Sequence, residues 1–287
     1  YQYDGGFQVN VYDTKNIRNI ALLGHSASGK TTLSEAILYT SGAVSRMGKI
    51  ENGTTKSDYL DDEINRQISI STSLMQTEWQ SVKINIIDTP GYADFVGEVI
   101  CAVSAADAGI LVIDALVGLE VGTETAWELC ENKKMPRILA VNRTGKENVK
   151  IDTILSAIHD RFGIKALPVQ IPVNAGVGFN TIVDIITMRE YTYNIEGKGT
   201  GKAGDISASL KAKADEYHEK LIEVAAESDD SLMEKYFESG LSPEEVSSGI
   251  KKAILNRMFY PIVFNDGLTN VGTDLLLNFV RDNIPSP

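Results

Sequence analysis

One stretch near the start of the chain limits what the remainder can fold into. From Ile20 to Thr32 an apolar run is followed by a glycine-rich turn and then by residues that continue as a helix. Gly24, Gly29, Lys30 and Thr31 satisfy the pattern G-x-x-x-x-G-K-[ST] of a phosphate-binding loop. Such glycines let successive backbone N–H groups curve around a phosphate, and the following helix directs its positive end to the same point. The stretch therefore predicts a strand–loop–helix unit that binds nucleotide phosphates.

The same loop supplies candidate side chains. We expect Lys30 to neutralise the β and γ phosphate oxygens as a catalytic residue, and the Thr31 hydroxyl to bind Mg²⁺. A chance match in an ordinary strand-to-helix turn is the alternative, and the helical pattern over residues 33–38 argues against it. The residues expected to contact the nucleotide here are Gly24, His25, Ser26, Ala27, Ser28, Gly29, Lys30, Thr31 and Thr32. We expect the His25 side chain to point away from the phosphates.

Composition narrows the class of protein. The 287 residues are 43% hydrophobic and 23% charged, which is typical of a globular chain of one large or two modest domains. A net charge of −12 predicts no direct sequence-specific nucleic acid binding, although a local patch can still dock on a ribonucleoprotein. Cys101 and Cys130 form no C-x-x-C pair and lie in apolar helical contexts, which predicts buried reduced thiols and a cytosolic location. No apolar run reaches membrane-spanning length, so we expect no membrane partner.

Apolar runs alternate with amphipathic stretches from Ile17 to about Pro172. The expected strands are residues 17–23, 68–77, 82–88, 109–114, 137–141 and 167–171, and the expected helices are residues 31–39, 95–105, 123–133 and 151–162. Runs such as residues 109–113 show no polar alternation, as in strands that are buried on both faces. The pattern predicts an α/β fold with a doubly wound, mostly parallel sheet, whose ligand binds beyond the carboxyl ends of the strands.

The pattern changes near Asn174. A weak strand signal over residues 190–195 precedes three helical patterns, and Ser242 and Pro243 begin the third as N-cap and first helical residue. A last strand near residues 261–264 and a helix over residues 272–284 follow. We therefore expect residues 1–16 as an N-terminal extension, residues 17–173 and 261–287 as the nucleotide domain, and residues 174–260 as an inserted α+β subdomain.

A second motif ends a hydrophobic strand: residues 88–91 read D-x-x-G. Here Asp88 is expected to hold the Mg²⁺, through water, and the Gly91 N–H to meet a γ-phosphate. An ordinary Asp-x-Pro-Gly turn is the alternative. Residues 57–70 are polar and loop-like until Ile68, which is typical of a segment that orders around Mg²⁺ and the γ-phosphate, with Ser69 supplying a metal-binding hydroxyl. A solvated loop is the alternative there.

Together these motifs resemble the GTP-binding domain of translational GTPases, specifically elongation factor G and its paralogues. The likeness also rests on residues 57–59, 66–70, 88–95 and 111–115, and it continues through residues 219–227 and 232–236 to the terminal Pro-Ser-Pro. It implies a P-loop NTPase fold, GTP or GDP with Mg²⁺ as cofactors, and GTP hydrolysis coupled to the ribosome as partner. We expect a cytoplasmic monomer. Because family members are much longer, the resemblance also implies further C-terminal domains.

The sequence departs from the family where the base is recognised. The family motif is N-K-x-D, whose Asp accepts two hydrogen bonds from guanine, and the matching residues are Asn142, Arg143, Thr144 and Gly145. Asn142 is retained, and Arg143 is expected to lie along the base. Gly145 has no carboxylate. Charge-assisted hydrogen bonds contribute about 1.5–3 kcal/mol each, so their loss predicts a weaker preference for guanine.

Two residues are candidates to replace that carboxylate. Glu147 lies nearby, but the register of its neighbours disfavours it. The family's remaining base contact is a backbone N–H in a loop that matches Asp266, Gly267 and Leu268, where we expect the Gly267 N–H to serve. Asp266 beside it is our hypothesis for a partial substitute, and Asp266→Ala should then weaken GDP binding.

A second departure concerns hydrolysis. The family places a His after D-x-x-G to orient the attacking water, and this chain has Tyr92. A phenol hydrogen-bonds water but suits neutral-pH proton transfer poorly, so we expect slow turnover, carried by positioning and electrostatics. Milder departures are Ser26 for an apolar residue, Ala27 for an Asp, Gln67 for a Gly and Ser69 for a Thr. Some paralogues of elongation factor G share the serine-rich loop and the Tyr, which indicates an elongation factor G-like paralogue.

Three functions compete at this stage. The leading one is a ribosome-associated GTPase domain. The second is a degenerate switch that holds a nucleotide with weakened guanine selectivity and little hydrolysis, and Tyr92 and Gly145 favour it. The third is a small-molecule kinase that shares only the phosphate-binding loop, and it leaves the D-x-x-G motif and the inserted subdomain unexplained.

Overall fold

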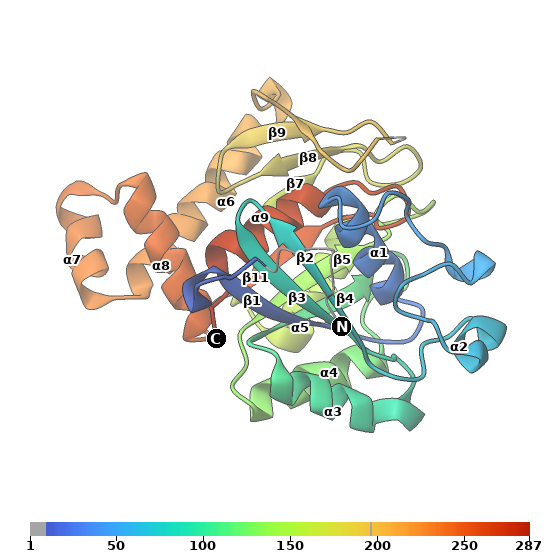
Figure 1. Cartoon of the computed structure of the whole chain (residues 1–287). Helices are drawn as coiled ribbons and strands as arrows, with labels where there is room; N and C mark the ends of the chain where they lie inside the picture. The colour runs from blue at the N-terminus through green and yellow to red at the C-terminus, as the bar shows by residue number, and fades with distance from the viewer. Residues whose placement is uncertain (1–9, 196) are drawn as a thin grey trace.

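A mostly parallel seven-stranded sheet forms the centre of the molecule (Figure 1). The computed structural model describes residues 10–195 and 197–287. In spatial order the strands are β2 (Ser73–Trp79), β3 (Val82–Asp88), β1 (Ile17–Leu23), β4 (Ala108–Asp114), β5 (Arg137–Asn142), β11 (Tyr260–Phe264) and β6 (Ala166–Pro168). Only β2 runs antiparallel to its neighbour, β3, among these pairs. The predicted doubly wound α/β architecture is confirmed.

Helices cover both faces of this sheet, which explains why its strands are continuous apolar runs. One face packs against α1 (Lys30–Thr40) and α9 (Thr273–Asn283), and the other packs against α3 (Val96–Ala105), α4 (Val121–Asn132) and α5 (Ile151–Phe162) (Figure 1). Every residue of β4 is buried. Alternate strand residues therefore join two separate cores, with Ile110 in the first and Leu111 in the second.

A second unit lies beside the first face. Its four-stranded antiparallel sheet has the order β10 (Lys202–Gly204), β9 (Arg189–Thr192), β8 (Thr181–Asp184) and β7 (Gln170–Pro172). The helices α6 (Ala208–Glu227), α7 (Asp230–Ser239) and α8 (Pro243–Leu255) follow in sequence. The predicted start of the third helix is confirmed: Ser242 is the N-cap and exchanges hydrogen bonds with Glu245 in a capping box.

Three predictions about local structure were wrong. The polar stretch before Ile68 contains a short helix, α2 (Asp61–Arg66), and the strand expected from Ile68 begins only at Ser73. The strand expected at 167–171 is two strands, because the chain leaves β11 after Pro168 and pairs with β8 from Gln170. Cys130 is buried, but Cys101 is exposed, since it lies on the solvent side of α3.

Other elements are short. The 3₁₀ turns η1 (Thr14–Asn16), η2 (Ile50–Asn52) and η3 (Ala93–Phe95) precede β1, α2 and α3 respectively. Residues 1–9 of the expected N-terminal extension lie outside the described residues. None of the described helices is both long and apolar enough to cross a membrane.

Candidate functional site

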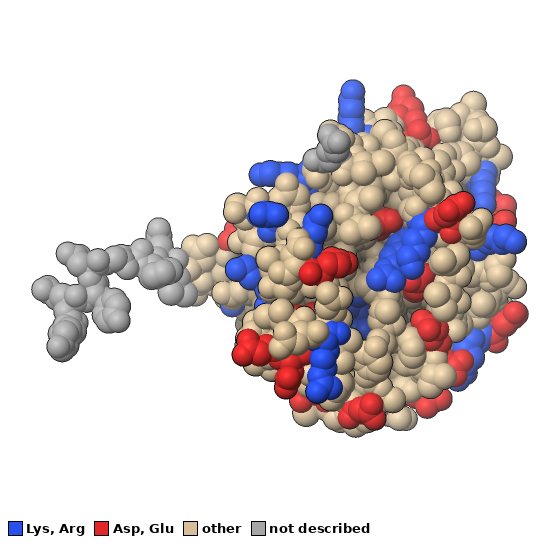
Figure 2. Space-filling view, turned by 90° about the vertical axis from the view of Figure 1, so that its right-hand side faces the viewer, with Lys and Arg blue, Asp and Glu red and all other residues tan. Residues whose placement is uncertain are grey.

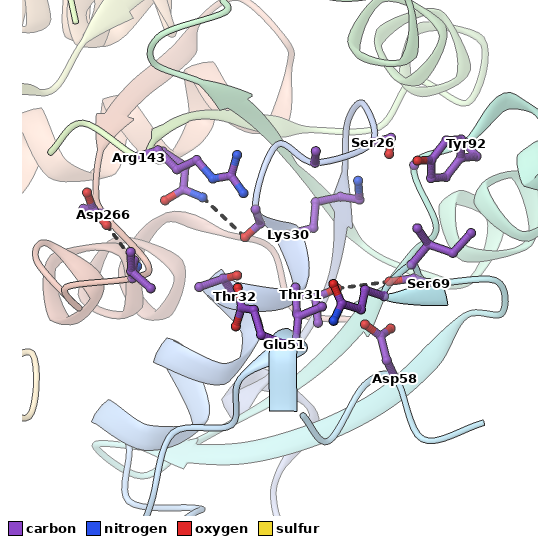
Figure 3. A pocket seen from close by; sticks show the side chains of 18 of the residues that line it. Ser26, Lys30, Thr31, Thr32, Glu51, Asp58, Ser69, Tyr92, Arg143 and Asp266 are labelled. Atoms are coloured by element: carbon purple, nitrogen blue, oxygen red, sulfur yellow. Dashed lines mark hydrogen bonds between the residues drawn. The ribbon is translucent and has the colours of Figure 1, made fainter. Parts of the chain in front are cut away.

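The carboxyl ends of the central strands meet along one edge of the sheet. The register pairs Leu22 with Asp88, and Asp114 with Asn142, so the loops that follow these strands lie side by side. A cavity of about 450 Å³ opens at this edge. In Figure 3, Arg143 and Asp266 lie at one end of the cavity, Ser69 and Tyr92 at the other, and Lys30 and Thr31 between them.

Residues 24–29 form a tight loop between β1 and α1. Gly24 has a φ of 135° and Gly29 a φ of 92°, values that side chains rarely allow. A Cβ at Gly24 would lie 2.5 Å from the Val112 carbonyl oxygen, and one at Gly29 would lie 2.4 Å from Asn142 Nδ2. Ala27 also has a positive φ, of 60°. The loop conformation thus requires glycine at both motif positions and packs the loop against β4 and β5.

Lys30 folds back over this loop from the first turn of α1. Its Nζ donates to the carbonyl oxygens of Gly24 at 3.0 Å and His25 at 2.8 Å. Burial lowers the pKa of Lys30 to about 8, although the nearby carboxylates of Asp88 and Asp58 act in the opposite direction. The ammonium group is therefore held in the cavity wall, where it can meet an anion.

Hydroxyl and carboxylate oxygens converge beside Lys30. Asp88 Oδ2 accepts hydrogen bonds from Thr31 Oγ1 at 2.9 Å and Ser57 Oγ at 2.6 Å. Thr31 Oγ1 is also 3.1 Å from Ser69 Oγ, and Figure 3 shows Asp58 next to Ser69. Within the described ranges, Asp88 Oδ1 and Asp58 Oδ1 are buried without a hydrogen-bond partner.

These oxygens fit Mg²⁺. Burial raises the pKa of Asp88 to about 6, and burial also raises the pKa of Asp58, so a bound cation would stabilise the ionised form of both carboxylates. No three His, Cys, Asp or Glu side chains of the described residues come together as a metal cluster. Mg²⁺ suits such a site because it binds through one or two carboxylates, hydroxyls, waters and substrate phosphates. Thr31, Ser69 and Asp88, which the sequence predicted, and Asp58, which it did not, are the residues that would hold it.

Two buried glutamates attach the segment between α1 and β2 to the site. Glu35 accepts hydrogen bonds from the backbone N–H groups of Gly48 and Lys56. Glu63 accepts from those of Ile70 and Ser71, both at 3.0 Å. These contacts place Ser69 at the cavity. Gln67 ends α2 in the left-handed conformation, with a φ of 55°, which explains why the family uses glycine at this position.

The D-x-x-G turn closes on the phosphate-binding loop. A Cβ at Gly91 would lie 2.5 Å from both Lys30 Nζ and Ser26 N, so this position admits no side chain. Tyr92 follows it, lines the cavity and is 44% exposed. Its phenol lies at the end of the cavity away from Arg143 and Asp266, as Figure 3 shows. The structure thus places Gly91 and Tyr92 together with Lys30, as the sequence predicted.

Asn142 organises the opposite end of the cavity. Its Nδ2 donates to the carbonyl oxygens of Ser28 at 3.1 Å and Gly29 at 3.3 Å, and its Oδ1 accepts from Gly267 N and Asn265 Nδ2, both at 2.9 Å. Asn142 therefore ties the phosphate-binding loop to the loop after β11. Gly267 N therefore donates to Asn142 in this structure, and its expected contact with a base stays a prediction.

Basic side chains line this end. Arg143 Nη1 and Lys146 Nζ each lie 3.0 Å from Asp114 Oδ2. Burial acts to raise the pKa of Asp114, but hydrogen bonds from the Leu116 backbone, Lys146 and Arg143 outweigh it and lower that pKa. Arg143 and Lys146 also line the cavity, so their stems form one of its walls. Glu147 is exposed and is not one of the residues that line the cavity.

The loop after β11 brings a carboxylate to the same place. Asp266 Oδ2 accepts a hydrogen bond from Gly145 N at 2.9 Å, and Asp266 Oδ1 accepts from Leu268 N at 2.9 Å and Thr269 N at 3.2 Å. Asp266 and Leu268 line the cavity, whereas Gly145 lies behind Asp266. The position matching the family carboxylate thus carries no side chain, and a different carboxylate covers it.

His25 turns away from the cavity. Its Nδ1 accepts a hydrogen bond from Gly122 N at 3.1 Å, and its Nε2 lies 3.3 Å from a carboxylate oxygen of Glu120. Together with Gly24 it lines a separate, largely apolar cavity of about 280 Å³ under Tyr92 and α4. This agrees with the expectation that its side chain points away from the phosphates.

Sequence reasoning missed several residues of the site. Asp58, Glu35 and Glu63 lack a local motif, and only their burial identifies them. Lys146 and Asp114 lie just after β5 and at the end of β4, so the rule that ligands bind beyond the carboxyl ends of strands was the available signal.

The face that carries α1 and α2 mixes acidic and basic side chains around the hollow (Figure 2).

The site combines a mostly parallel sheet with a glycine-rich phosphate loop, a buried Lys and a set of convergent oxygens. This is the arrangement of a P-loop nucleotide-binding domain. The sequence model of the elongation factor Tu GTP binding domain matches residues 15–286, and the chain belongs to this family. A crystal structure of a protein from Thermus thermophilus is similar, with a TM-score of 0.89 and 30% identity. That match covers 95% of this chain and 41% of the other, so the chain spans less than half the length of that protein.

Proposed function

We propose that the chain is the nucleotide-binding and GTP-hydrolysing domain of an elongation factor G-like translation factor that acts on the ribosome. The observation that carries the proposal is the contact of 3.1 Å between Thr31 Oγ1 and Ser69 Oγ. It joins the phosphate-binding loop to the segment that also supplies Asp58. A site whose second half comes from a separate segment can report the presence of a γ-phosphate by ordering that segment.

The proposed role of each residue follows from its position in the site. Lys30 and the backbone of residues 24–29 would hold the β and γ phosphates, and Thr31, Ser69, Asp58 and Asp88 would hold Mg²⁺. When bound, Mg²⁺ supplies positive charge for the phosphate oxygens during phosphoryl transfer. The Gly91 backbone lies against Lys30, and Tyr92 would position the attacking water. Translation takes place in the cytoplasm, and we propose that location, a monomer and a connection to further C-terminal domains.

Nucleotide titration tests the binding part. We expect calorimetry with Mg²⁺ to show GDP binding that Lys30→Ala weakens by at least about tenfold, because the loss of one charge-assisted contact has that effect. Lys49→Ala, an exposed lysine in the segment after α1, is the matched control and should bind as the parent does. Failure of the parent chain to bind GDP, GTP or ADP would refute the proposal.

A degenerate switch with little hydrolysis is the second candidate, and Tyr92 is the observation that favours it. The longer protein should hydrolyse GTP faster when ribosomes are added if the leading proposal holds. Binding without ribosome-stimulated turnover would favour the degenerate switch. Tyr92→His separates the two further, since it should raise turnover only if the remaining machinery is intact.

A further inference from the structure

Two loops that are far apart in sequence meet at the base end of the cavity, one carrying Gly145 and the other Asp266. Gly145 N donates to Asp266 Oδ2 at 2.9 Å. A Cβ built on Gly145 would lie 2.5 Å from the same oxygen. The carboxylate of Asp266 therefore occupies the space into which any side chain at position 145 would begin to extend.

The orientation of this carboxylate is fixed. Leu268 N and Thr269 N donate to Oδ1, and Gly145 N donates to Oδ2. Two carboxylate oxygens offer about four lone-pair sites, so three accepted bonds leave further capacity. Asp266 is only 4% exposed, yet it lines the cavity. In Figure 3 it lies with Arg143 at the end away from Ser69 and Tyr92.

We propose that Asp266 reads the guanine base, its Oδ2 accepting a hydrogen bond from the N1–H and N2–H edge at the one remaining acceptor site, in place of a carboxylate at position 145. The inference rests on the proposed function and deepens it. Guanine presents two donors on that edge, whereas adenine presents a ring-nitrogen acceptor that a carboxylate repels. In this chain the carboxylate that recognises guanine comes from the loop after β11, and not from the loop after β5.

The neighbouring groups support this assignment. Arg143 and Lys146 are held by Asp114, so they do not neutralise Asp266. Asn142 ties the loop of Asp266 to the phosphate-binding loop, because it accepts from Gly267 N and donates to the Ser28 and Gly29 carbonyl oxygens. The base end is thus built on buried hydrogen bonds from two strand ends and keeps one pocket-lining carboxylate oriented by three backbone N–H groups.

A purely structural role is the competing explanation. The backbones of Asp266 and Val271 form an antiparallel bridge, and Asp266 Oδ1 accepts from Leu268 N and Thr269 N, so the carboxylate also shapes the loop between them. That role predicts equal weakening of all nucleotides on substitution. Base recognition predicts weakening for guanine alone. Selectivity therefore decides between the two, and binding strength by itself does not.

The first test is calorimetric titration of the chain and of Asp266→Asn with GDP, IDP, ADP and XDP in the presence of Mg²⁺. The parent should prefer GDP to IDP, which lacks the 2-amino group, and to ADP. Asp266→Asn should weaken GDP by about tenfold to a hundredfold, as expected for a lost charge-assisted hydrogen bond, while ADP is unchanged. Its amide N–H donates to the C2 carbonyl of xanthine, so its affinity for XDP should rise relative to GDP.

The second test exchanges the two positions. Gly145 has a backbone φ outside the left-handed region, so its backbone admits Asp once the Asp266 carboxylate is removed. Asp266→Ser and Gly145→Asp should each reduce GDP selectivity, the second because two carboxylates then crowd one site. The double variant Gly145→Asp/Asp266→Ser should return the GDP over ADP preference to within about threefold of the parent, as strong coupling of contacting residues predicts.

The outcomes separate the inference from the proposed function. Absence of any nucleotide binding by the parent refutes both. Binding of GDP and ADP with equal affinity, or equal weakening of all four nucleotides by Asp266→Asn, refutes only the role of Asp266. A double variant no better than Asp266→Ser refutes it as well. Asp282→Asn, an exposed carboxylate on α9, is the matched control, and thermal melts confirm that each variant is folded.

Discussion

Arg137, the first residue of β5, carries a guanidinium group with no exposed surface. The group lies 3.9 Å from the ring centroid of Trp127 and 4.8 Å from that of Tyr260. It donates to the Trp127 carbonyl oxygen at 2.9 Å and pairs with Glu131. A buried cation is tolerated only where hydrogen-bond acceptors and aromatic rings compensate for the lost water. Trp127 and Tyr260 of the second core therefore pack around this cation.

Arg137→Ala should lower the free energy of unfolding by about 2–4 kcal/mol, because it removes ring contacts and leaves a cavity. Arg137→Met, which retains much of the volume, should cost less. Urea unfolding of the chain measures both. Glu131→Gln is the control, since its side chain is 42% exposed and its loss should cost under about 1 kcal/mol. Equal losses for Arg137→Ala and Glu131→Gln would contradict this account.

Single residues differ in how far sequence predicts them. Gly24, Gly29 and Lys30 were identified because a phosphate-binding loop needs fixed spacing and fixed backbone angles. Asp58 was not, because nothing local distinguishes it from Asp61 or the other carboxylates around it. Its role depends on burial, which only the folded segment creates. The contact of the Gly267 N–H with Asn142 was not predicted for a similar reason, since Asn142 lies at the end of β5, far away in the sequence.

Helices and strands also differ in how far the sequence predicts them. The ends of the strands β1, β3 and β4 and of the helix α5 were predicted to within a residue. Their sequences show the apolar run of a buried strand or the single apolar stripe of an amphipathic helix. The short helix α2 was missed because its residues are polar, and its buried residue, Glu63, folds toward the chain that follows. The split after Pro168 is a tertiary effect. The extended residues 166–172 pair first with β11 in the central sheet and then with β8 in the second sheet, and this pairing sets where each strand ends.

The segment between α1 and β2 depends on carboxylates rather than on an apolar core. Glu63 is 1% exposed and accepts N–H bonds from Leu60, Ile70 and Ser71. Glu35 holds Gly48 and Lys56. Few apolar contacts and several backbone bonds to two side chains describe a segment able to open locally.

Glu63→Gln should release this segment without unfolding the molecule. One acceptor oxygen becomes a donor that faces N–H groups, so the amides of Ile70 and Ser71 should exchange about tenfold to a hundredfold faster. Hydrogen exchange followed by mass spectrometry measures this. Asp62→Asn, an exposed neighbour on α2, should leave exchange unchanged. Faster exchange throughout the central sheet would instead mean that Glu63 supports global stability.

At the scale of the whole molecule, the second sheet is joined to the nucleotide-binding sheet through α9. Asp274, in the first turn of α9, accepts from Tyr193 Oη at 2.7 Å and from Gly201 N at 2.9 Å. Thr40 at the end of α1 donates to Asn270 Oδ1 at 3.0 Å, in the loop that carries Asp266. Gly199, from the loop before β10, lies against Asn270. The second unit therefore braces the loop that we assign to the base.

Burial raises the pKa of Asp274, while the hydrogen bonds from Gly201 N and the Tyr193 hydroxyl lower it. Its folded-state pKa lies above the unfolded value, so the molecule binds more protons than the unfolded chain between these two values. The contribution of this carboxyl to stability is therefore fully present below the unfolded pKa, and it is lost as the pH rises through the folded one. Removing the Tyr193 hydroxyl should raise the folded pKa further and shift that loss to higher pH.

Tyr193→Phe should thus destabilise the protein more at about pH 8 than at about pH 4, because only the ionised carboxylate strongly needs the lost donor. We expect a cost of about 1–3 kcal/mol at the higher pH and clearly less at the lower one. Urea unfolding at both values measures the difference. Tyr191→Phe, two residues earlier in β9 and half-buried, is the matched control and should show no such pH dependence. A pH-independent cost for Tyr193→Phe would mean that the ring packing, and not Asp274, joins the two units. Calorimetric titration of Tyr193→Phe with GDP is a second measurement. Loosening the junction between the two units should also weaken GDP binding, because Asn270 lies in the loop that carries Asp266.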